Sequence, residues 1–361
     1  MMSKTSKLFQ SILILAAVSM LLAACGQPAA TPQATSAGTQ ATAPVATNPP
    51  APVTTDTPAP LSGGVLTIGI GSEPNTLDPG AAVYVQEQFV LISLFDSLLS
   101  VAPDASLHPG LALSWQPNTD YTEFTFKLRQ DVKFHDGTPF NAAAVKASFD
   151  HIVNPDVLES GGKTLLDDHK YLETAVIDDY DVTVKFGASY PTFLSDAGRQ
   201  WLSISSPTAL ALYGKDYGRH PVGTGPFKFV KWDAQSQIVL ERNPDYNWAP
   251  EYASHQGPAY LDQVVFRILP EAATRLTAFQ SNELQVVSDP PALDTISMSD
   301  SGQAVVATFP NPGIPAIMMI NTDKEPTNDI NVRKAMILAV NQDELAKTVF
   351  KSLGMPAYSV L

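Results

Sequence analysis

The chain has 361 residues, a formal net charge of −14 and an apolar fraction of 44%. At roughly 150 residues per domain this length favours two or three domains, and the apolar fraction excludes wholesale disorder. A polyanion repels phosphate backbones, which argues against nucleic-acid binding as a general function. The single cysteine, Cys25, excludes an intrachain disulfide and a cysteine-based metal site. No cofactor is expected.

Residues 1–24 have the features of an export signal. Lys4 and Lys7 precede an apolar run over residues 8–22, which is shorter than the roughly 20 residues that a membrane span needs. The run leads into Leu-Ala-Ala-Cys, which resembles the lipobox of bacterial lipoproteins. This resemblance implies cleavage before Cys25 and attachment of a diacylglycerol to its sulfur. The alternative is a chance cysteine at the end of an ordinary secretory signal.

Residues 25–62 are predicted to be a lipidated cysteine followed by a disordered tether. The stretch after Cys25 is rich in Pro, Ala and Thr, and its only charged side chain is Asp56. It has too few apolar side chains to offset the entropy lost on folding. Behind a lipid anchor, such a segment would hold a folded body away from the membrane surface.

The folded body is expected to begin at Gly63 and to mix strands with helices. Phe124, Phe126 and Leu128 alternate with polar residues, which is typical of a half-buried strand. Asn141 is expected to cap a helix over 142–152. The other predicted strands are 64–70, 181–186, 226–230, 237–241 and 263–269, and the other predicted helices are 86–99, 271–284 and 330–350. Interspersed strands and helices indicate the α/β class.

No catalytic motif stands out. The chain has no G-x-S-x-G elbow and no phosphate-binding loop, and its six histidines form no i, i+4 pair. Gly223 and Gly225 are expected to form a tight turn, and His135 with Asp136 a hairpin turn rather than a metal or catalytic pair. These observations argue against an enzyme and against a metal site.

Several segments resemble the family 5 extracellular solute-binding proteins of ABC transporters. The most specific is FTFKLRQDVKFHDGTPF at 124–140, and the others include PVGTGPFKF at 221–229, 261–266 with 274–280, and 331–344. The resemblance runs from about residue 63 to the last residues. It implies an α/β chain with the two-lobed periplasmic-binding-protein type II fold, in its three-subdomain peptide-binding variant.

The resemblance also implies a domain division. Residues 63–95 and 203–300 would form a discontinuous domain I, 96–202 an inserted domain II, and 301–361 the start of domain III. Members of the family are usually considerably longer, so the fold is expected to be incomplete at the C-terminus. In that case, Met318, Met319, Ile337 and other apolar side chains of the last segment would lack partners.

By this resemblance the protein is a lipid-anchored, extracytoplasmic receptor, not an enzyme, and a monomer. It would capture peptides or a related small solute between its lobes and deliver it to the permease of an ABC importer. One alternative within the family is a nickel chelate or another non-peptide solute. An alternative from another class is a secreted, lipid-anchored hydrolase.

The ligand-binding residues implied by the resemblance are Val83, Tyr84, Val85, Tyr171 and Arg199. The first three follow Leu-Asp-Pro at 77–79, a segment that borders the cleft in the family. Tyr171 matches an aromatic that lines the cleft in nickel-binding members, and Arg199 lies near the position of a carboxylate-binding arginine. The alternatives are a packed aromatic for Tyr84 and a solvent-exposed loop for Tyr171 and Arg199.

Overall fold

The structure is a computed structural model that describes residues 61–157, 160–307, 317–349, 351 and 356. The predicted export signal, Cys25 and nearly all of the predicted tether lie outside the described residues. No described helix combines the length and the apolar character that crossing a bilayer requires.

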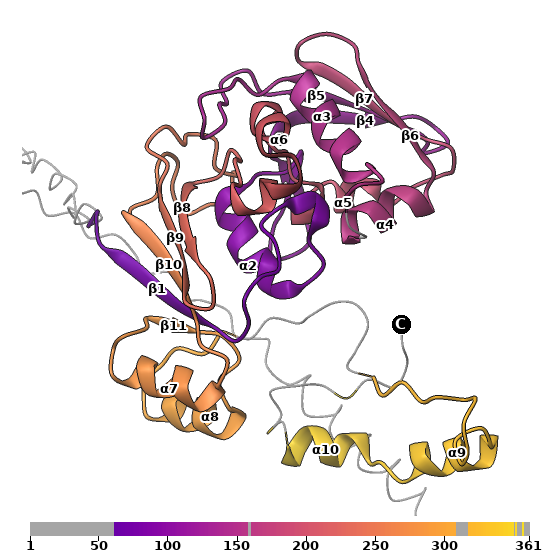
Figure 1. Cartoon of the computed structure of the whole chain (residues 1–361), viewed down its shortest axis with the longest axis vertical. Coiled ribbons are helices and arrows are strands. Elements are labelled where there is room, and N and C mark those ends of the chain that lie inside the picture. The colour runs from indigo at the N-terminus through magenta and orange to yellow at the C-terminus, as the bar shows by residue number, and fades with distance from the viewer. Residues whose placement is uncertain (1–60, 158–159, 308–316, 350, 352–355, 357–361) are drawn as a thin grey trace, which may run out of the picture. The chain divides into compact units, whose positions relative to one another are not determined.

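A five-stranded sheet carries the first strand of the body (Figure 1). Its strands are β1 (Val65–Ile70), β8 (Phe227–Asp233), β9 (Gln237–Arg242), β10 (Gln263–Ile268) and β11 (Val286–Val287), in the order β11-β1-β10-β9-β8. Strand β1 runs parallel to β10 and β11, whereas β8, β9 and β10 pair antiparallel. The predicted strands 64–70, 226–230, 237–241 and 263–269 are therefore confirmed.

Helix α2 (Val85–Leu94) packs on the core of this sheet through Val90, Leu91 and Leu94. The predicted helix 86–99 was too long, since Phe95 is already extended and β2 (Leu99–Val101) follows. The reason is a distant contact: the backbone N of Gly225 donates to the Leu94 carbonyl at 2.9 Å. A Cβ on Gly225 would collide with the Leu94 and Phe95 backbone, so only glycine allows this approach.

A separate sheet of the body is four-stranded and antiparallel (Figure 1). It contains β4 (Ala112–Pro117), β5 (Glu123–Leu128), β6 (Tyr171–Val176) and β7 (Asp181–Phe186), in the order β4-β5-β7-β6. Helix α3 (Ala142–Ile152) packs against it, and Asn141 caps this helix by accepting from Ala144 N at 3.1 Å, as predicted. Phe124 and Phe126 are fully buried, which confirms the predicted alternation.

Two hydrophobic clusters underlie these sheets. The cluster of the four-stranded sheet draws its buried residues from positions 98–204, and that of the five-stranded sheet from positions 70–95 and 209–268. Tyr246 and Trp248 are exceptions, because they follow β9 in the chain but pack in the cluster of the four-stranded sheet. The division into domains I, II and III stays a prediction.

Shorter elements connect the two sheets and follow them. They are η1 (Pro79–Ala81), β3 (Leu107–Pro109), α4 (Gly161–Asp168), α5 (Phe193–Asp196), η2 (Gln200–Leu202), α6 (Pro207–Tyr213), η3 (Gly214–Arg219), α7 (Ala272–Gln280) and α8 (Ala292–Asp300). Helix α7 ends four residues before the predicted end at 284, where the chain turns into β11.

The single helix predicted over 330–350 is wrong. The chain forms α9 (Ile330–Leu338) and α10 (Gln342–Thr348) instead. Asn341 separates them because its side chain accepts from Glu344 N at 3.1 Å and so starts a new helix. Asp329 caps α9 by accepting from Asn331 N at 2.8 Å, and neither helix buries a residue.

Candidate ligand-binding site

The loop that precedes α2 is fixed by two buried carboxylates. Asp78 accepts from Gly80 N at 2.9 Å and pairs with His151 Nε2 at 2.7 Å. Glu87, which is 1% exposed, accepts from the backbone N of Val83 at 2.6 Å and of Tyr84 at 2.8 Å. The loop therefore has little freedom, although it is not regular secondary structure.

Val83 and Tyr84 point outward from this fixed loop. Their exposed fractions are 47% and 54%. Tyr84 is the N-cap residue of α2, and Val85 begins the helix, with only its backbone described. Two half-exposed side chains on a fixed backbone can contact a ligand with little further loss of backbone freedom.

Three segments meet beside this loop. Gly161 N, at the start of α4, donates to the Ala82 carbonyl at 3.3 Å, and 3₁₀-helix η2 contacts both η1 and α4. A Cβ on Gly161 would lie 2.6 Å from the Trp201 ring, so glycine is required for this packing. The structure thus brings the Val83–Tyr84 loop and the segment that starts at Arg199 into the same region.

Arg199 stands at the start of η2 with its guanidinium accessible. Its side chain is 54% exposed and its Nε lies 2.9 Å from Asp196 Oδ1. The Trp201 ring lies 5.9 Å from the guanidinium carbon. An arginine arranged in this way retains N–H groups for a carboxylate, which it can bind in a fork geometry.

Tyr171 occupies a different environment. At the start of β6 its ring packs at 5.9 Å from that of Phe149 and 6.1 Å from that of Phe186, and its hydroxyl donates to Thr174 Oγ1 at 2.8 Å. Burial raises the pKa of Tyr171 to about 12. No described hydrogen bond, ion pair or ring contact joins it to Tyr84 or Arg199.

The sequence reasoning missed the acidic residues that hold the backbone of the Val83–Tyr84 loop and the Arg199 side chain. Glu87 lies three residues after the N-cap Tyr84, a spacing at which a side chain can return to the loop backbone. Asp196 lies three residues before Arg199, which is a pairing distance within one turn. Asp78 and His151 are 73 positions apart, so no pattern of neighbouring residues in the sequence predicts their hydrogen bond.

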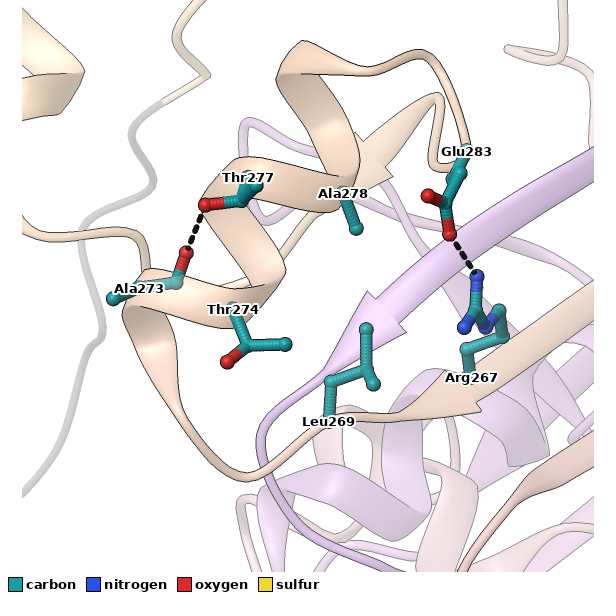
Figure 2. Close-up of a pocket in the computed structure, with 7 residues that line it drawn as sticks. All are labelled: Arg267, Leu269, Ala273, Thr274, Thr277, Ala278 and Glu283. Carbon is teal, nitrogen blue, oxygen red and sulfur yellow. Dashed lines mark hydrogen bonds and ion pairs between the residues drawn. The ribbon is translucent and has the colours of Figure 1, made fainter.

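Two hollows lie elsewhere, against helix α7. One has a volume of about 340 Å³ and is lined by Arg267, Leu269, Ala273, Thr274, Thr277, Ala278 and Glu283 (Figure 2). Three of its polar side chains have partners: Arg267 pairs with Glu283 at 3.1 Å, and Thr277 Oγ1 donates to the Ala273 carbonyl. The other, of about 580 Å³, is lined by Phe279, Gln280, Asn282, Leu284, Gln285, Met298 and Gln303. Neither contains a predicted ligand-binding residue.

The His135 turn is structural, as expected. His135 Nε2 donates to the Gly225 carbonyl at 3.0 Å, and burial lowers the pKa of the imidazole to about 4, so it is neutral at pH 7. Gly137 has φ +84° in the following turn position. Among the described residues, no three His, Cys, Asp or Glu side chains are grouped so that they could hold a metal ion.

Residues 106–361 match the family described as bacterial extracellular solute-binding proteins, family 5 Middle. One relative is the glutathione-binding protein GsiB of Pectobacterium atrosepticum, which is 31% identical over 80% of this chain and 54% of its own length. The chain therefore spans about half the length of the curated relatives that it matches.

Solved structures agree with this assignment. The ABC transporter-associated periplasmic binding protein DppA of Helicobacter pylori, in complex with the peptide STSA, is 25% identical with a TM-score of 0.67, over 81% of this chain and 59% of that chain. The binding protein MoaA of A. tumefaciens R10, in complex with mannopinic acid, is 27% identical with a TM-score of 0.70, over 81% and 58%. The expected type II periplasmic-binding-protein fold is thus confirmed over the stretch that the chain covers. The chain belongs to the bacterial extracellular solute-binding proteins of family 5.

Proposed function

We propose that this protein is the extracytoplasmic receptor of an ABC importer and that it captures a small peptide or a related solute with a free carboxylate. Family membership supports a solute receptor. Glutathione, the peptide STSA and mannopinic acid, which appear in the names of the relatives, are all carboxylic acids. The hydrolase alternative has no support from this family.

The observation that carries the proposal is the half-exposed guanidinium of Arg199 in the region of the fixed Val83–Tyr84 loop. In our proposal Arg199 binds the solute carboxylate, and Val83, Tyr84 and Val85 contact its apolar parts. Tyr171 would act as part of the wall through its ring. An Arg–carboxylate contact in a desolvated cleft gives both affinity and orientation.

We also propose that a diacylglycerol on Cys25 anchors the protein and that residues 26–62 act as its tether. The receptor would deliver its solute to the permease subunits of the importer as a monomer. Anchoring keeps the receptor at high local concentration beside the permease.

The test of this function is a calorimetric titration of the intact protein with glutathione and with unblocked di-, tri- and tetrapeptides. We expect at least one of these carboxylate-bearing solutes to bind with 1:1 stoichiometry, and the same solute blocked as its C-terminal amide to bind more weakly. If no carboxylate-bearing compound binds, or if the amides bind equally well, the proposed function is wrong.

A further inference from the structure

Arg199 lies at the end of a chain of contacts that begins in the core. Tyr190 is fully buried, and its ring stacks on His169 at 3.5 Å with an interplanar angle of 5°. It also packs against the ring of Phe193, with centroids 5.3 Å apart. The Tyr190 hydroxyl donates to Asp196 Oδ2 at 2.9 Å. A rigid aromatic ring therefore fixes one oxygen of the Asp196 carboxylate.

The other oxygen of Asp196 faces Arg199. Asp196 Oδ1 lies 2.9 Å from Arg199 Nε, and the Arg199 backbone N donates to the Asp196 carbonyl at 2.9 Å. The Asp196 side chain is only 8% exposed, whereas that of Arg199 is 54% exposed. The buried Asp196 carboxylate is therefore bonded to Tyr190 through Oδ2 and to the accessible Arg199 guanidinium, at Nε, through Oδ1.

The Tyr190 hydroxyl remains a donor under all ordinary conditions. Burial, together with the neighbouring charge of Asp196, raises the pKa of Tyr190. The hydroxyl therefore stays protonated and keeps orienting the carboxylate, which leaves Oδ1 directed to Arg199. Asp196 is the one carboxylate paired with Arg199 in the described part of the chain.

We propose that Asp196 and Tyr190 are positioning residues that hold Arg199 so that its Nη edge receives a carboxylate of the bound solute. This inference rests on the proposed function. A free arginine side chain loses rotamer entropy when it binds, and fixing it beforehand reduces that cost. Because Nε is taken by Asp196, the Nη1 and Nη2 groups are the donors left for the solute, and they match the two oxygens of a carboxylate.

The alternative is that the ion pair only stabilises the turn between α5 and η2. The two roles predict opposite changes in the affinity of Asp196→Asn for an anion. Removing a negative charge beside Arg199 would by itself strengthen the binding of an anion. If Asp196 positions Arg199, binding weakens instead, because the neutral asparagine amide oxygen holds Nε less strongly than the carboxylate does, and the guanidinium gains freedom to move.

The experiment uses acetate as the carboxylate probe, with chloride as the ionic-strength control. Acetate is titrated into the intact protein, and binding is followed by the NMR signal of the Trp201 indole N–H, assigned through Trp201→Phe. The variants are Asp196→Asn, Tyr190→Phe, Arg199→Ala and the double variant Asp196→Asn/Arg199→Ala. The matched control is Asp150→Asn, which breaks the exposed Lys146–Asp150 pair on α3. Thermal melts verify that each variant is folded.

We expect Asp196→Asn to weaken acetate binding by about threefold to tenfold, because Arg199 must then be immobilised when the anion binds. Tyr190→Phe should weaken acetate binding by less. Asp150→Asn should bind as the wild type does. In the Arg199→Ala background, Asp196→Asn should cause no further weakening of acetate binding, because the positioning effect acts through Arg199.

Three results would overturn the inference. They are unchanged or tighter acetate binding in Asp196→Asn, an equal loss from Asp196→Asn with and without Arg199, and a wild-type signal that acetate does not move. These results do not depend on the peptide titrations. Failure of every peptide to bind would overturn the proposed function, whereas the acetate series decides the role of Asp196.

Discussion

His151 Nε2 lies 2.7 Å from Asp78 Oδ2 and connects α3 to the loop that precedes α2. Both side chains are largely buried, and the other oxygen of Asp78 holds Gly80 N at 2.9 Å. A single carboxylate therefore joins α3, the helix that packs against the four-stranded sheet, to the loop that carries Val83 and Tyr84. The geometry of that loop depends on a contact far along the chain.

Asp78→Ala should lower the free energy of unfolding by about 1–3 kcal/mol, because it leaves the His151 ring and Gly80 N without their buried partner. Urea denaturation at pH 7 measures the change. The matched control is Asp150→Ala on the exposed end of the Lys146 pair, which should change stability by less than about 0.5 kcal/mol. Equal effects of the two substitutions would contradict this role for Asp78.

Arg275→Met should destabilise the protein on the order of 3 kcal/mol, because four backbone carbonyls lose the buried, charged side chain that donates to them. Arg275 is 4% exposed and donates to the carbonyls of Leu269, Pro270, Ser288 and Asp289 at 2.7–3.1 Å. It thereby holds together the segments that follow β10 and β11, the two strands on either side of β1.

The control for this prediction is Arg267→Met, since Arg267 makes an exposed ion pair with Glu283. Arg267→Met should lower the free energy of unfolding by less than about 1 kcal/mol. Chemical denaturation monitored by circular dichroism compares the two variants. If Arg275→Met lowers the free energy of unfolding no more than Arg267→Met does, the hydrogen bonds from Arg275 to the carbonyls contribute little to stability.

Asp96 should make stability depend on pH. Its carboxylate accepts from Thr224 Oγ1 at 2.8 Å and from Trp248 Nε1 at 2.9 Å. Burial outweighs these hydrogen bonds and raises the pKa of Asp96 in the folded state. The folded protein therefore binds the proton more tightly than the unfolded chain, so protonation favours folding and this gain is lost as pH rises through the folded-state pKa.

Relative to Asp96→Asn, which cannot titrate, the wild type should gain stability as the pH falls from 7 to 4. Using the difference between the two proteins cancels the contributions of the other acidic groups. The measurement is the free energy of unfolding of both proteins at several pH values. A difference that stays constant over this range would contradict the prediction.

Cys25→Ala should move the protein from the membrane fraction to the soluble extracytoplasmic fraction. The reason is that several acyl chains on Cys25, at about 0.8 kcal/mol per buried CH₂, would provide the anchor. Cell fractionation with immunodetection gives the distribution, and Ser36→Ala in the predicted tether serves as the control. Retention of the cysteine-free protein on the membrane would exclude lipid anchoring at this position.

The local patterns predicted most of the fold. Alternation at Phe124 and Phe126 is a property of neighbouring residues, and so is the cap that Asn141 provides. The end of α2 at Leu94 was missed because Gly225, from a distant part of the chain, supplies the donor that stops it. The division of residues 330–350 had a local signal in Asn341, which the apolar spacing around it concealed.

The candidate site was less predictable than the fold. The resemblance led to Val83, Tyr84 and Arg199, and these belong to segments that the structure brings to one region. It gave no indication of Glu87 or Asp196, because the groups that hold a ligand-binding side chain depend on tertiary packing. Arg199 was predicted because it lies near the position of a carboxylate-binding arginine in the family. Its orientation, in contrast, depends on Asp196, which is itself held by the buried Tyr190.

Carboxylate binding by Arg199 is tested by the calorimetric affinity of wild type and Arg199→Ala for glutathione and for unblocked tetrapeptides. Loss of a desolvated Arg–carboxylate contact should cost about 2–5 kcal/mol, so Arg199→Ala should bind the preferred solute well over tenfold more weakly. The variant should melt within a few degrees of the wild type in the absence of solute, because Arg199 is half exposed. Wild-type affinity in Arg199→Ala would contradict the account.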